Sequence, residues 1–460
     1  MSAHARLPMM RSLAAEAAWW RSEVRAHRVA VVAIAAMIVV GTALRANTIG
    51  SNPRVSKDEA AIVTDADSIL DGKHYATLRW APGTPLLFAA SALASGRHWV
   101  EARPRSSGPA QRAQLLVEIL TLVAVAMVAW RLAGRGAACL AVALTAFYEP
   151  LILTTRTYLS EPLGGLATLG LFVVACWART RGIRAVAVAG VAAGIACLIR
   201  EDLIPAVAVV AVAIAASAWR QSHGRAMTRG LVYLGAAILA VAPWAVAASN
   251  LDGRFVPITD GGPNALFVGT YLPAEGNLYE TLKQFRPEVC RRLPQDCAHY
   301  SQLGSAPMFE LIAQRYPHMS AAAAIDRAAL DNLRKYGLGH PAAFAEMLLI
   351  KLWSMWGHPW GGGDSARMLT STWQHYLFVG LAWIGLLGGA ILTRRWSLIT
   401  VTIGLATVTA LNVLVITDGR HNLRLTPLLF TFGAAGAWFM LERLRAYIAI
   451  RRREPLASVG

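Results

Sequence analysis

The strongest constraint on the fold is a series of apolar blocks along the chain, each with almost no charge. Blocks of about 16–20 residues have the length at which a helix crosses a hydrocarbon core of about 30 Å. Only 15% of the residues are charged, against about a quarter in soluble domains. A soluble chain would alternate apolar and polar residues at helix or strand spacing instead. The sequence therefore predicts an all-α polytopic membrane protein.

About ten of the blocks have the length of transmembrane helices. They cover residues 29–45, 113–131, 137–154, 162–178, 185–199, 203–219, 231–248, 375–393, 397–416 and 423–443. Two shorter apolar blocks, 82–95 and 343–358, are broken or flanked by Pro, Gly, Lys and Trp. Because blocks of that length more often lie at the membrane surface than cross it, we expect two interfacial segments as well.

Basic residues set the expected orientation of these spans. The formal net charge is +17, and arginines gather in the short links between blocks. With the N-terminus inside, four short basic links and the C-terminal tail fall on the cytoplasmic side, as the positive-inside rule requires. The arginines between 97 and 112 then lie outside, and four short links outweigh this one long one. We read the charge as an orientation signal with attraction to membrane lipids, and expect no nucleic-acid partner.

The topology divides the chain into five regions. They are a cytoplasmic tail (1–28), a transmembrane domain (29–248) with an outer loop (46–112), an extracytoplasmic loop and interfacial helix (249–374), C-terminal transmembrane helices (375–443) and a cytoplasmic tail (444–460). We place the chain in the bacterial inner (plasma) membrane as a multi-pass protein.

The long outer loop is predicted to form helices on the membrane surface. The segment Met308–Gly337 has helical spacing, and Pro317 should divide it in two. Its expected buried positions are Phe309, Leu311, Ile312, Ile325, Leu330 and Leu333. Cys290 and Cys297 share this loop and are close enough to form a disulfide in an oxidising compartment.

Acidic residues stand at two outer links. Asp58-Glu59 follows the first span and precedes a helix-like stretch that stops at Asp71-Gly72, before the Pro-interrupted segment Trp80–Leu87. Glu161-Pro162 opens a later span. Helix capping and the helix dipole are the competing interpretation of both acidic sites. A basic cluster, Gly419–Pro427, precedes the last span.

Together these segments resemble the GT-C superfamily of polyprenyl-phosphate-dependent glycosyltransferases, which includes protein O-mannosyltransferases and lipid A aminoarabinose transferases. Its members carry an Asp-Glu pair in the first outer loop, a later acid–Pro pair, and a basic and aromatic cluster before the last span. Two positions depart from the pattern: Glu161, where some members have Asp, and His421-Asn422, where Arg-Tyr is common. The resemblance covers most of residues 29–430 and implies a GT-C-like fold and a polyprenyl-phosphate sugar donor. It also implies that the transmembrane domain 29–248 is the catalytic domain, with an extracytoplasmic active site.

The chemistry of such a donor requires a base and no general acid. A lipid phosphate is a stable leaving group, unlike the leaving group in glycoside hydrolysis. The acceptor hydroxyl must lose a proton, and we expect Asp58 to be the general base. The resemblance implies an inverting transfer. Glu59 and Glu161 are expected to orient the acceptor or Asp58, or to share a cation. No His/Cys cluster indicates a metal site, and the need for a divalent cation is left open.

The leaving phosphate develops negative charge, which cationic groups would stabilise. Arginine suits bidentate contact with a phosphate. The candidates for binding the donor phosphate are Arg54, Lys57, Arg79, Arg420 and Arg424, with contact to lipid head groups as the competing interpretation of each. Arg200-Glu201-Asp202 is interpreted mainly as a structural ion pair, with contact to the donor as the alternative. Glu118 lies inside the second span, where an acid suggests a functional site, and snorkelling is the simpler interpretation.

Two other functions stay open on the sequence. One is a secondary transporter, which should place polar or broken helices at the membrane midplane in matching positions of two halves. Here the acids gather at the outer surface, and no half resembles the other. The other is a non-catalytic assembly partner in cell-envelope synthesis. For a transferase the acceptor would be a glycan, a lipid or a protein hydroxyl.

Overall fold

The structure is a computed structural model that describes residues 13–51, 55–73, 75–97, 108–297, 300, 305–360, 368–417 and 419–453. Over these ranges the chain is helical and has no strand. Seven of the helices are long and apolar enough to cross a membrane. They are α2 (Arg28–Ala46), α5 (Pro109–Ala133), α8 (Glu161–Arg179), η1 with α10 (Glu201–Trp219), α11 (His223–Asp252), α19 (Met368–Thr393) and α20 (Trp396–Leu414). The expected polytopic all-α membrane fold is confirmed.

The other three predicted spans are shorter or differently divided. Helices α6 (Arg135–Phe147) and α9 (Ile183–Ile199) are short apolar helices, and α21 (Thr426–Arg453) takes the place of block 423–443. The prediction of a single span over 137–154 was wrong. The backbone is extended at Tyr148, and a separate helix α7 (Glu149–Thr154) follows. Pro150 explains the break, because proline has no N–H and fits only the first turn of a new helix.

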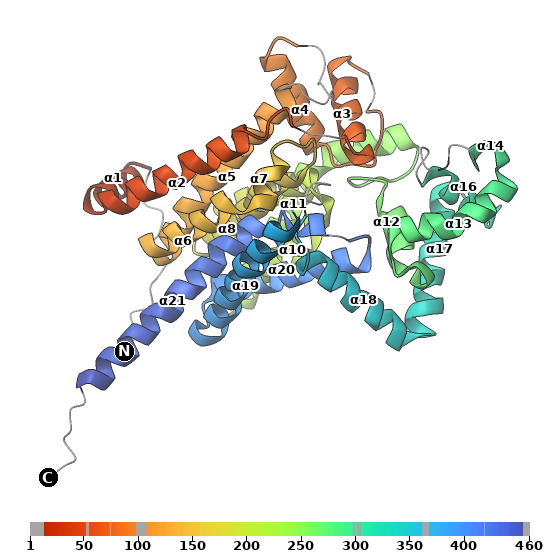
Figure 1. The fold of residues 1–460 in the computed structure, drawn as a ribbon. Helices are drawn as coiled ribbons and strands as arrows, with labels where there is room; N and C mark the ends of the chain where they lie inside the picture. The colour runs from red at the N-terminus through yellow and green to blue at the C-terminus, as the bar shows by residue number, and fades with distance from the viewer. Residues whose placement is uncertain are drawn as a thin grey trace.

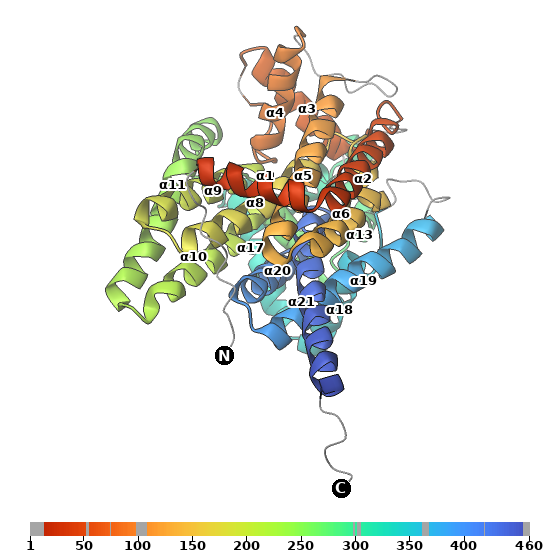
Figure 2. The same ribbon diagram turned by 90° about the vertical axis from the view of Figure 1, so that its left-hand side faces the viewer.

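Glycines let neighbouring helices approach closely. A Cβ atom on Gly190 or Gly194 of α9 would lie 2.2 or 2.5 Å from a carbonyl oxygen of α11. A Cβ on Gly385 of α19 would lie 2.2 Å from the carbonyl oxygen of Gly433 in α21. Small residues four positions apart are the usual means of packing helices tightly in a membrane. Figures 1 and 2 show the resulting bundle, with α21 running out at one end.

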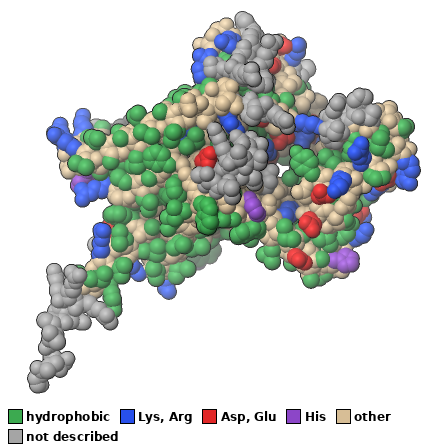
Figure 3. Space-filling model, in the orientation of Figure 1, with side chains coloured by type: hydrophobic (Ala, Val, Ile, Leu, Met, Phe, Trp, Pro, Cys, Tyr) green, Lys and Arg blue, Asp and Glu red, His purple; other side chains and the backbone are tan. Residues whose placement is uncertain are grey.

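The outward surface of the bundle is apolar. Val212, Leu239 and Ile391 are 69%, 73% and 72% exposed, which suits contact with lipid chains. Figure 3 shows hydrophobic side chains over the lower left of the molecule and charged side chains gathered at its right. The charged part contains the segment 262–338, which we call the loop module.

The loop module and one further helix group stand at the other end of the bundle from α21 (Figure 1). Helices α3 (Lys57–Leu70) and α4 (Gly83–Ala94) form that group. The module contains α12 (Gly262–Thr270), η2 (Leu272–Ala274), α13 (Leu278–Arg292), α14 (Pro294–Cys297), α16 (Ala306–Gln314), α17 (Ala321–Asn332) and the π-helical turn η3 (Leu333–Leu338). Helix α18 (Pro341–Trp356) connects it to the bundle, and α1 (Leu13–Ala26) precedes α2.

The expected break at Pro317 is confirmed, since α16 ends at Gln314 and α17 begins at Ala321. Leu330 was expected to be buried but is 48% exposed. Helix α17 packs on its neighbours through Ala328 and Ala329, so the next residue, Leu330, faces away from that hydrophobic cluster. Cys290 and Cys297 form a disulfide in the structure.

Lys351 of α18 anchors the loop module to the bundle. The side chain is buried, and its Nζ donates to the carbonyl oxygens of Gly269 in α12, at 2.9 Å, and Val415 after α20, at 2.5 Å. Burial lowers the pKa of Lys351 to about 7. The unfolded chain therefore binds more protons than the folded protein between about pH 7 and the usual lysine range.

We expect the thermal stability of the wild type to rise between about pH 7 and 9.5 relative to that of a Lys351→Met variant. The uncharged methionine has a similar length and removes the titrating group. Unfolding followed by intrinsic fluorescence at several pH values measures the difference. Parallel pH profiles of the two proteins would contradict this account of Lys351.

A buried ion pair joins three helices inside the bundle. Arg45 of α2 is 0% exposed, and its Nε lies 3.3 Å from Oε2 of Glu118 in α5. Its guanidinium also donates to the carbonyl oxygens of Gly41, Thr145 and Ala146 at 3.0–3.1 Å. The prediction that Glu118 snorkels toward the outer surface is wrong. An arginine from another helix pairs with its carboxylate inside the bundle.

Candidate active site

The start of α3 is fixed by Glu59. Ser56 caps the helix by accepting from the N–H of Glu59, and Oε2 of Glu59 accepts in return from the N–H of Ser56 at 2.7 Å. Oε1 accepts from the N–H of Tyr158 at 2.9 Å, so the same carboxylate holds the link before α8. The helix-capping interpretation applies to Glu59, whose oxygens are both engaged. Asp58, next to it, keeps a side chain that is 29% exposed.

Asp58 and Glu161 meet on one guanidinium group. Arg420 lies on η5 (Gly419–Asn422), and its Nη2 is 3.1 Å from Oδ2 of Asp58. Its Nε is 3.3 Å from Oε1 of Glu161. The structure thus brings together three residues from three separate outer links.

Glu161 is the more buried of the two acids. It is the first residue of α8, where the helix dipole favours a negative charge, and Pro162 follows it. Its side chain is 2% exposed, and Nη1 of Arg200 lies 4.0 Å from Oε1. Its Oε2 atom is buried and has no hydrogen-bond partner among the described residues. That oxygen is an unused acceptor beside two cations.

A second layer of charge lies behind Glu161. Asp202 pairs with Arg200, whose Nε is 3.4 Å away, and with the buried Arg424. Arg424 also donates to Oδ1 of Asn412 at 2.6 Å. The ions therefore alternate in sign from Asp58 to Arg424. Asn412 was missed in the sequence, where the only signal is a side-chain amide inside an apolar block.

The other predicted phosphate contacts lie elsewhere or are not described. Arg54 lies outside the described residues. Lys57 is exposed on the first turn of α3. Arg79 is also exposed, and its guanidinium lies 6.0 Å from the ring centre of Trp80. Among the described residues, the structure pairs Arg420 directly with Asp58.

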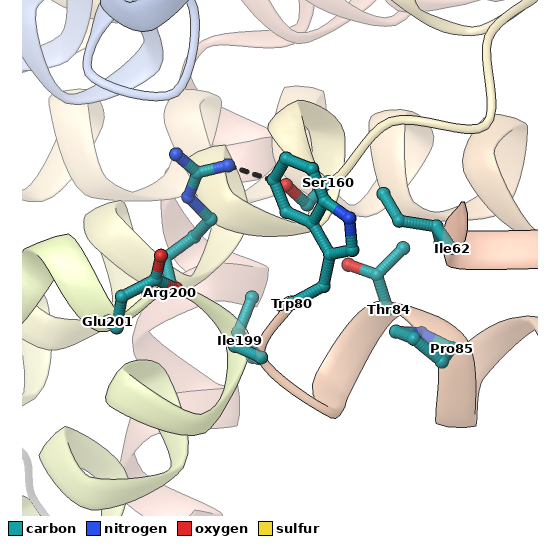
Figure 4. Close-up of a pocket in the computed structure, with 9 residues that line it drawn as sticks. Ile62, Trp80, Thr84, Pro85, Ser160, Ile199, Arg200 and Glu201 are labelled. Carbon is teal, nitrogen blue, oxygen red and sulfur yellow. Dashed lines mark hydrogen bonds between the residues drawn. The ribbon is translucent and has the colours of Figure 1, made fainter. Parts of the chain in front are cut away.

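A small hollow opens beside this network (Figure 4). Trp80, Thr84, Ser160 and Arg200 are among the residues that line it, and Arg200 donates to Oγ of Ser160 at 2.6 Å. Trp80 Nε1 and Thr84 Oγ1 are buried without a hydrogen-bond partner in the described part of the chain. The free space is about 10 Å³, which admits one water molecule or one hydroxyl group.

Asp65 stabilises the turn that carries Trp80. It is fully buried on α3 and accepts from the backbone N–H of Thr77 at 2.7 Å and from its hydroxyl at 3.0 Å. Burial raises the pKa of Asp65 to about 6, and the bonds from Thr77 oppose that rise.

The described residues contain no cluster of three or more His, Cys, Asp or Glu side chains that could hold a metal ion.

Gly419 allows Arg420 to reach the acids. A Cβ atom at this position would lie 2.6 Å from the carbonyl oxygen of His358, closer than real Cβ contacts. We expect Gly419→Ala to displace η5 and to lower any catalytic rate that depends on Arg420 by about tenfold to a hundredfold, because small misplacements of catalytic groups are costly. Rates of Gly262→Ala, where a Cβ meets nothing within 4 Å, provide the matched control. Equal rates for both variants would contradict the requirement.

No protein-family model matches this chain, and no curated protein matches it in sequence. The archaeal oligosaccharyltransferase AglB from Archaeoglobus fulgidus, solved with an inhibitory peptide and a dolichol-phosphate, matches in structure with a TM-score of 0.50 and 11% identity. The match covers 93% of this chain and 52% of AglB, so the chain spans about half the length of that protein.

A further match is ArnT from Cupriavidus metallidurans bound to undecaprenyl phosphate, with a TM-score of 0.40, 13% identity, and coverage of 90% of this chain and 78% of that one. The similarity to AglB is one of fold. The chain therefore has the polytopic helical membrane fold of the GT-C glycosyltransferases.

Proposed function

We propose that this protein is a membrane glycosyltransferase that moves a sugar from a polyprenyl-phosphate donor to a hydroxyl acceptor. The observation that carries the proposal is the convergence of Asp58 and Glu161 on the guanidinium of Arg420, at 3.1 and 3.3 Å. It occurs in a fold shared with an oligosaccharyltransferase that was solved with a dolichol-phosphate. A base and a phosphate-binding cation in contact are what transfer from a lipid phosphate requires.

Asp58 is the general base in this proposal. Its carboxylate is partly exposed, so an acceptor hydroxyl is able to approach it. The hydroxyl oxygen attacks the anomeric carbon, its proton passes to Asp58, and the bond from that carbon to the phosphate oxygen breaks. Attack opposite to the leaving phosphate inverts the configuration of the sugar.

Arg420 binds the leaving phosphate. In the structure its charge is shared by two carboxylates, which hold the guanidinium in place. A lipid phosphate is a competing partner, because its oxygens match the donor fork of arginine. Contact with the phosphate would release Asp58 from its ion pair, so that its carboxylate becomes available to the acceptor hydroxyl. Donor binding would thus activate the base.

The remaining predicted site residues support these two. Glu161 offers its unused Oε2 to the acceptor or to a divalent cation. Glu59 positions Asp58 through the capping box. Arg424 is fully buried on Asp202, and we propose that it holds the second layer in place and makes no contact with the phosphate. Lys57 and Arg79 are exposed and would meet the lipid phosphate at the membrane surface.

The site is proposed to face the extracytoplasmic side of the bacterial inner membrane. We expect the Cys290–Cys297 pair to resist a membrane-impermeant maleimide in intact spheroplasts and to react after reduction with an impermeant phosphine. Cys139 and Cys176, inside apolar helices, serve as internal controls that need detergent. Labelling of the pair only after lysis would place the loop module in the cytoplasm.

Two experiments test the proposed function. Mass spectrometry of envelope glycans from a deletion strain should show one missing sugar that the intact gene restores. The purified protein in liposomes should release polyprenyl phosphate from a lipid-linked sugar only when an acceptor hydroxyl is present. An unchanged glycan profile together with uptake of a solute by the liposomes would favour a transporter instead.

A further inference from the structure

A second cavity, separate in its lining from the candidate active site, lies in the loop module. Its volume is about 290 Å³, close to the lower end of the range for small-molecule sites. It opens between α12, α16, α17 and the π-helical turn η3. The lining includes Phe267, Tyr271, Tyr316, Asp331, Asn332 and Tyr336.

Aromatic rings and planar polar groups share this lining. Phe267 and Tyr271 stack with ring centres 5.8 Å apart, and Tyr336 meets Tyr271 edge-on at 6.1 Å. The hydroxyl of Tyr316 donates to Oδ2 of Asp331 at 3.0 Å, which holds that carboxylate in position. Such a surface presents flat apolar faces next to hydrogen-bonding groups.

The local backbone at the cavity is unusual. Helix α17 passes at Leu333 into a π-helical turn that ends at Leu338. Turns of this kind are rare and are often found at functional sites. Here the turn carries Lys335 and Tyr336, both of which line the cavity, and Nζ of Lys335 lies 5.1 Å from the ring centre of Tyr336.

The cavity is mechanically connected to the candidate active site. Phe267 belongs to the same hydrophobic cluster as Ile416, in the segment that leads from α20 to Arg420. A Cβ atom on Gly269 would lie 2.4 Å from the carbonyl carbon of Val415, so α12 rests directly on that segment. Lys351 bonds to both Gly269 and Val415. The wall of the cavity therefore packs against Val415 and Ile416, which precede Arg420 in the chain.

We infer that this cavity binds a saccharide unit of a glycan acceptor, an inference that rests on the proposed transferase function. A pyranose ring has an apolar C–H face that packs on aromatic rings, and its hydroxyl groups form hydrogen bonds with carboxylate, amide and phenol groups. Both kinds of partner are present in a space that fits about one sugar ring. The acceptor class is thus a glycan, and the cavity aligns it with the active site.

Saturation-transfer NMR with the full-length protein in nanodiscs tests the inference. The probes are the methyl glycosides of glucose, galactose and mannose, and the disaccharide chitobiose. We expect at least one to bind, and Tyr316→Phe and Tyr336→Leu to weaken that binding by about fivefold or more, the loss expected for one hydrogen bond or one ring contact. Lys283→Gln, which removes an exposed ion pair with Glu280 on the same module, should bind as the wild type does.

Kinetics separate this inference from the proposed function. Tyr316→Phe should raise KM for the bound saccharide as acceptor and leave kcat close to that of the wild type, since the donor site is intact. Saccharide binding without transfer from any lipid donor would contradict the proposed transferase function and would still support the cavity assignment. Absence of binding by all four probes, equal binding by the cavity variants, or binding of a hydroxyl-bearing peptide alone would overturn the assignment.

Discussion

Replacing Asp58 by asparagine is expected to lower the rate of sugar transfer by about a hundredfold to ten-thousandfold, the usual contribution of a general base. The amide has nearly the same shape as the carboxylate and is able to accept from Arg420, so the helix start and the fold should persist. It has no charge and does not take up the hydroxyl proton. The loss should therefore fall on kcat, with donor binding retained.

The measurement is release of polyprenyl phosphate at saturating acceptor, with donor affinity determined separately by equilibrium binding. Asp71→Asn at the other end of α3 is a matched control, because this exposed carboxylate pairs only with the neighbouring Lys73 among the described contacts. Its rate should equal that of the wild type. An Asp58→Asn enzyme with more than about a tenth of the wild-type rate would assign the base to another group.

The apolar pattern was sufficient to predict the class of fold. Block length alone separates a membrane bundle from a soluble one, because the thickness of the hydrocarbon core is fixed. The same signal missed the break at Tyr148, because residues on both sides of it are apolar and only the proline marks it. Block length predicts burial in a membrane and does not determine where a helix ends.

The acids of the candidate site were also predictable, since charged residues at the ends of apolar blocks are conspicuous. The cation that pairs with both acids, Arg420, was harder to predict. Arg420 lies 362 residues from Asp58 in the sequence, and five basic residues were equally plausible by composition. The choice among them depends on how η5 packs against His358, a contact between two loops that no periodicity reveals. The saccharide cavity was invisible for the same reason, because four helices contribute its walls.

Replacing Glu118 by leucine is expected to lower the free energy of unfolding by about 3–5 kcal/mol, the cost of leaving a buried partner charge unpaired. Arg45 is the partner, with Nε 3.3 Å from the carboxylate. The hydroxyl of Thr154 donates to the other carboxylate oxygen at 3.2 Å, so this contact is lost as well. Arg45 and Glu118 are both buried, at 0% and 2% exposed.

The double variant Arg45→Met with Glu118→Leu is the decisive comparison. Exchanging both charges for apolar groups of similar volume removes the penalty of the unpaired ion, and in other proteins such exchanges are often neutral. The double variant should therefore be more stable than Glu118→Leu alone, despite carrying one more substitution. The stability that the double variant still loses should come from the three carbonyl groups that no longer accept a hydrogen bond from Arg45. Thermal unfolding of all four proteins in the same nanodiscs gives the coupling energy. A coupling energy near zero would mean that the pair is incidental and that the arginine is held by the carbonyl groups alone.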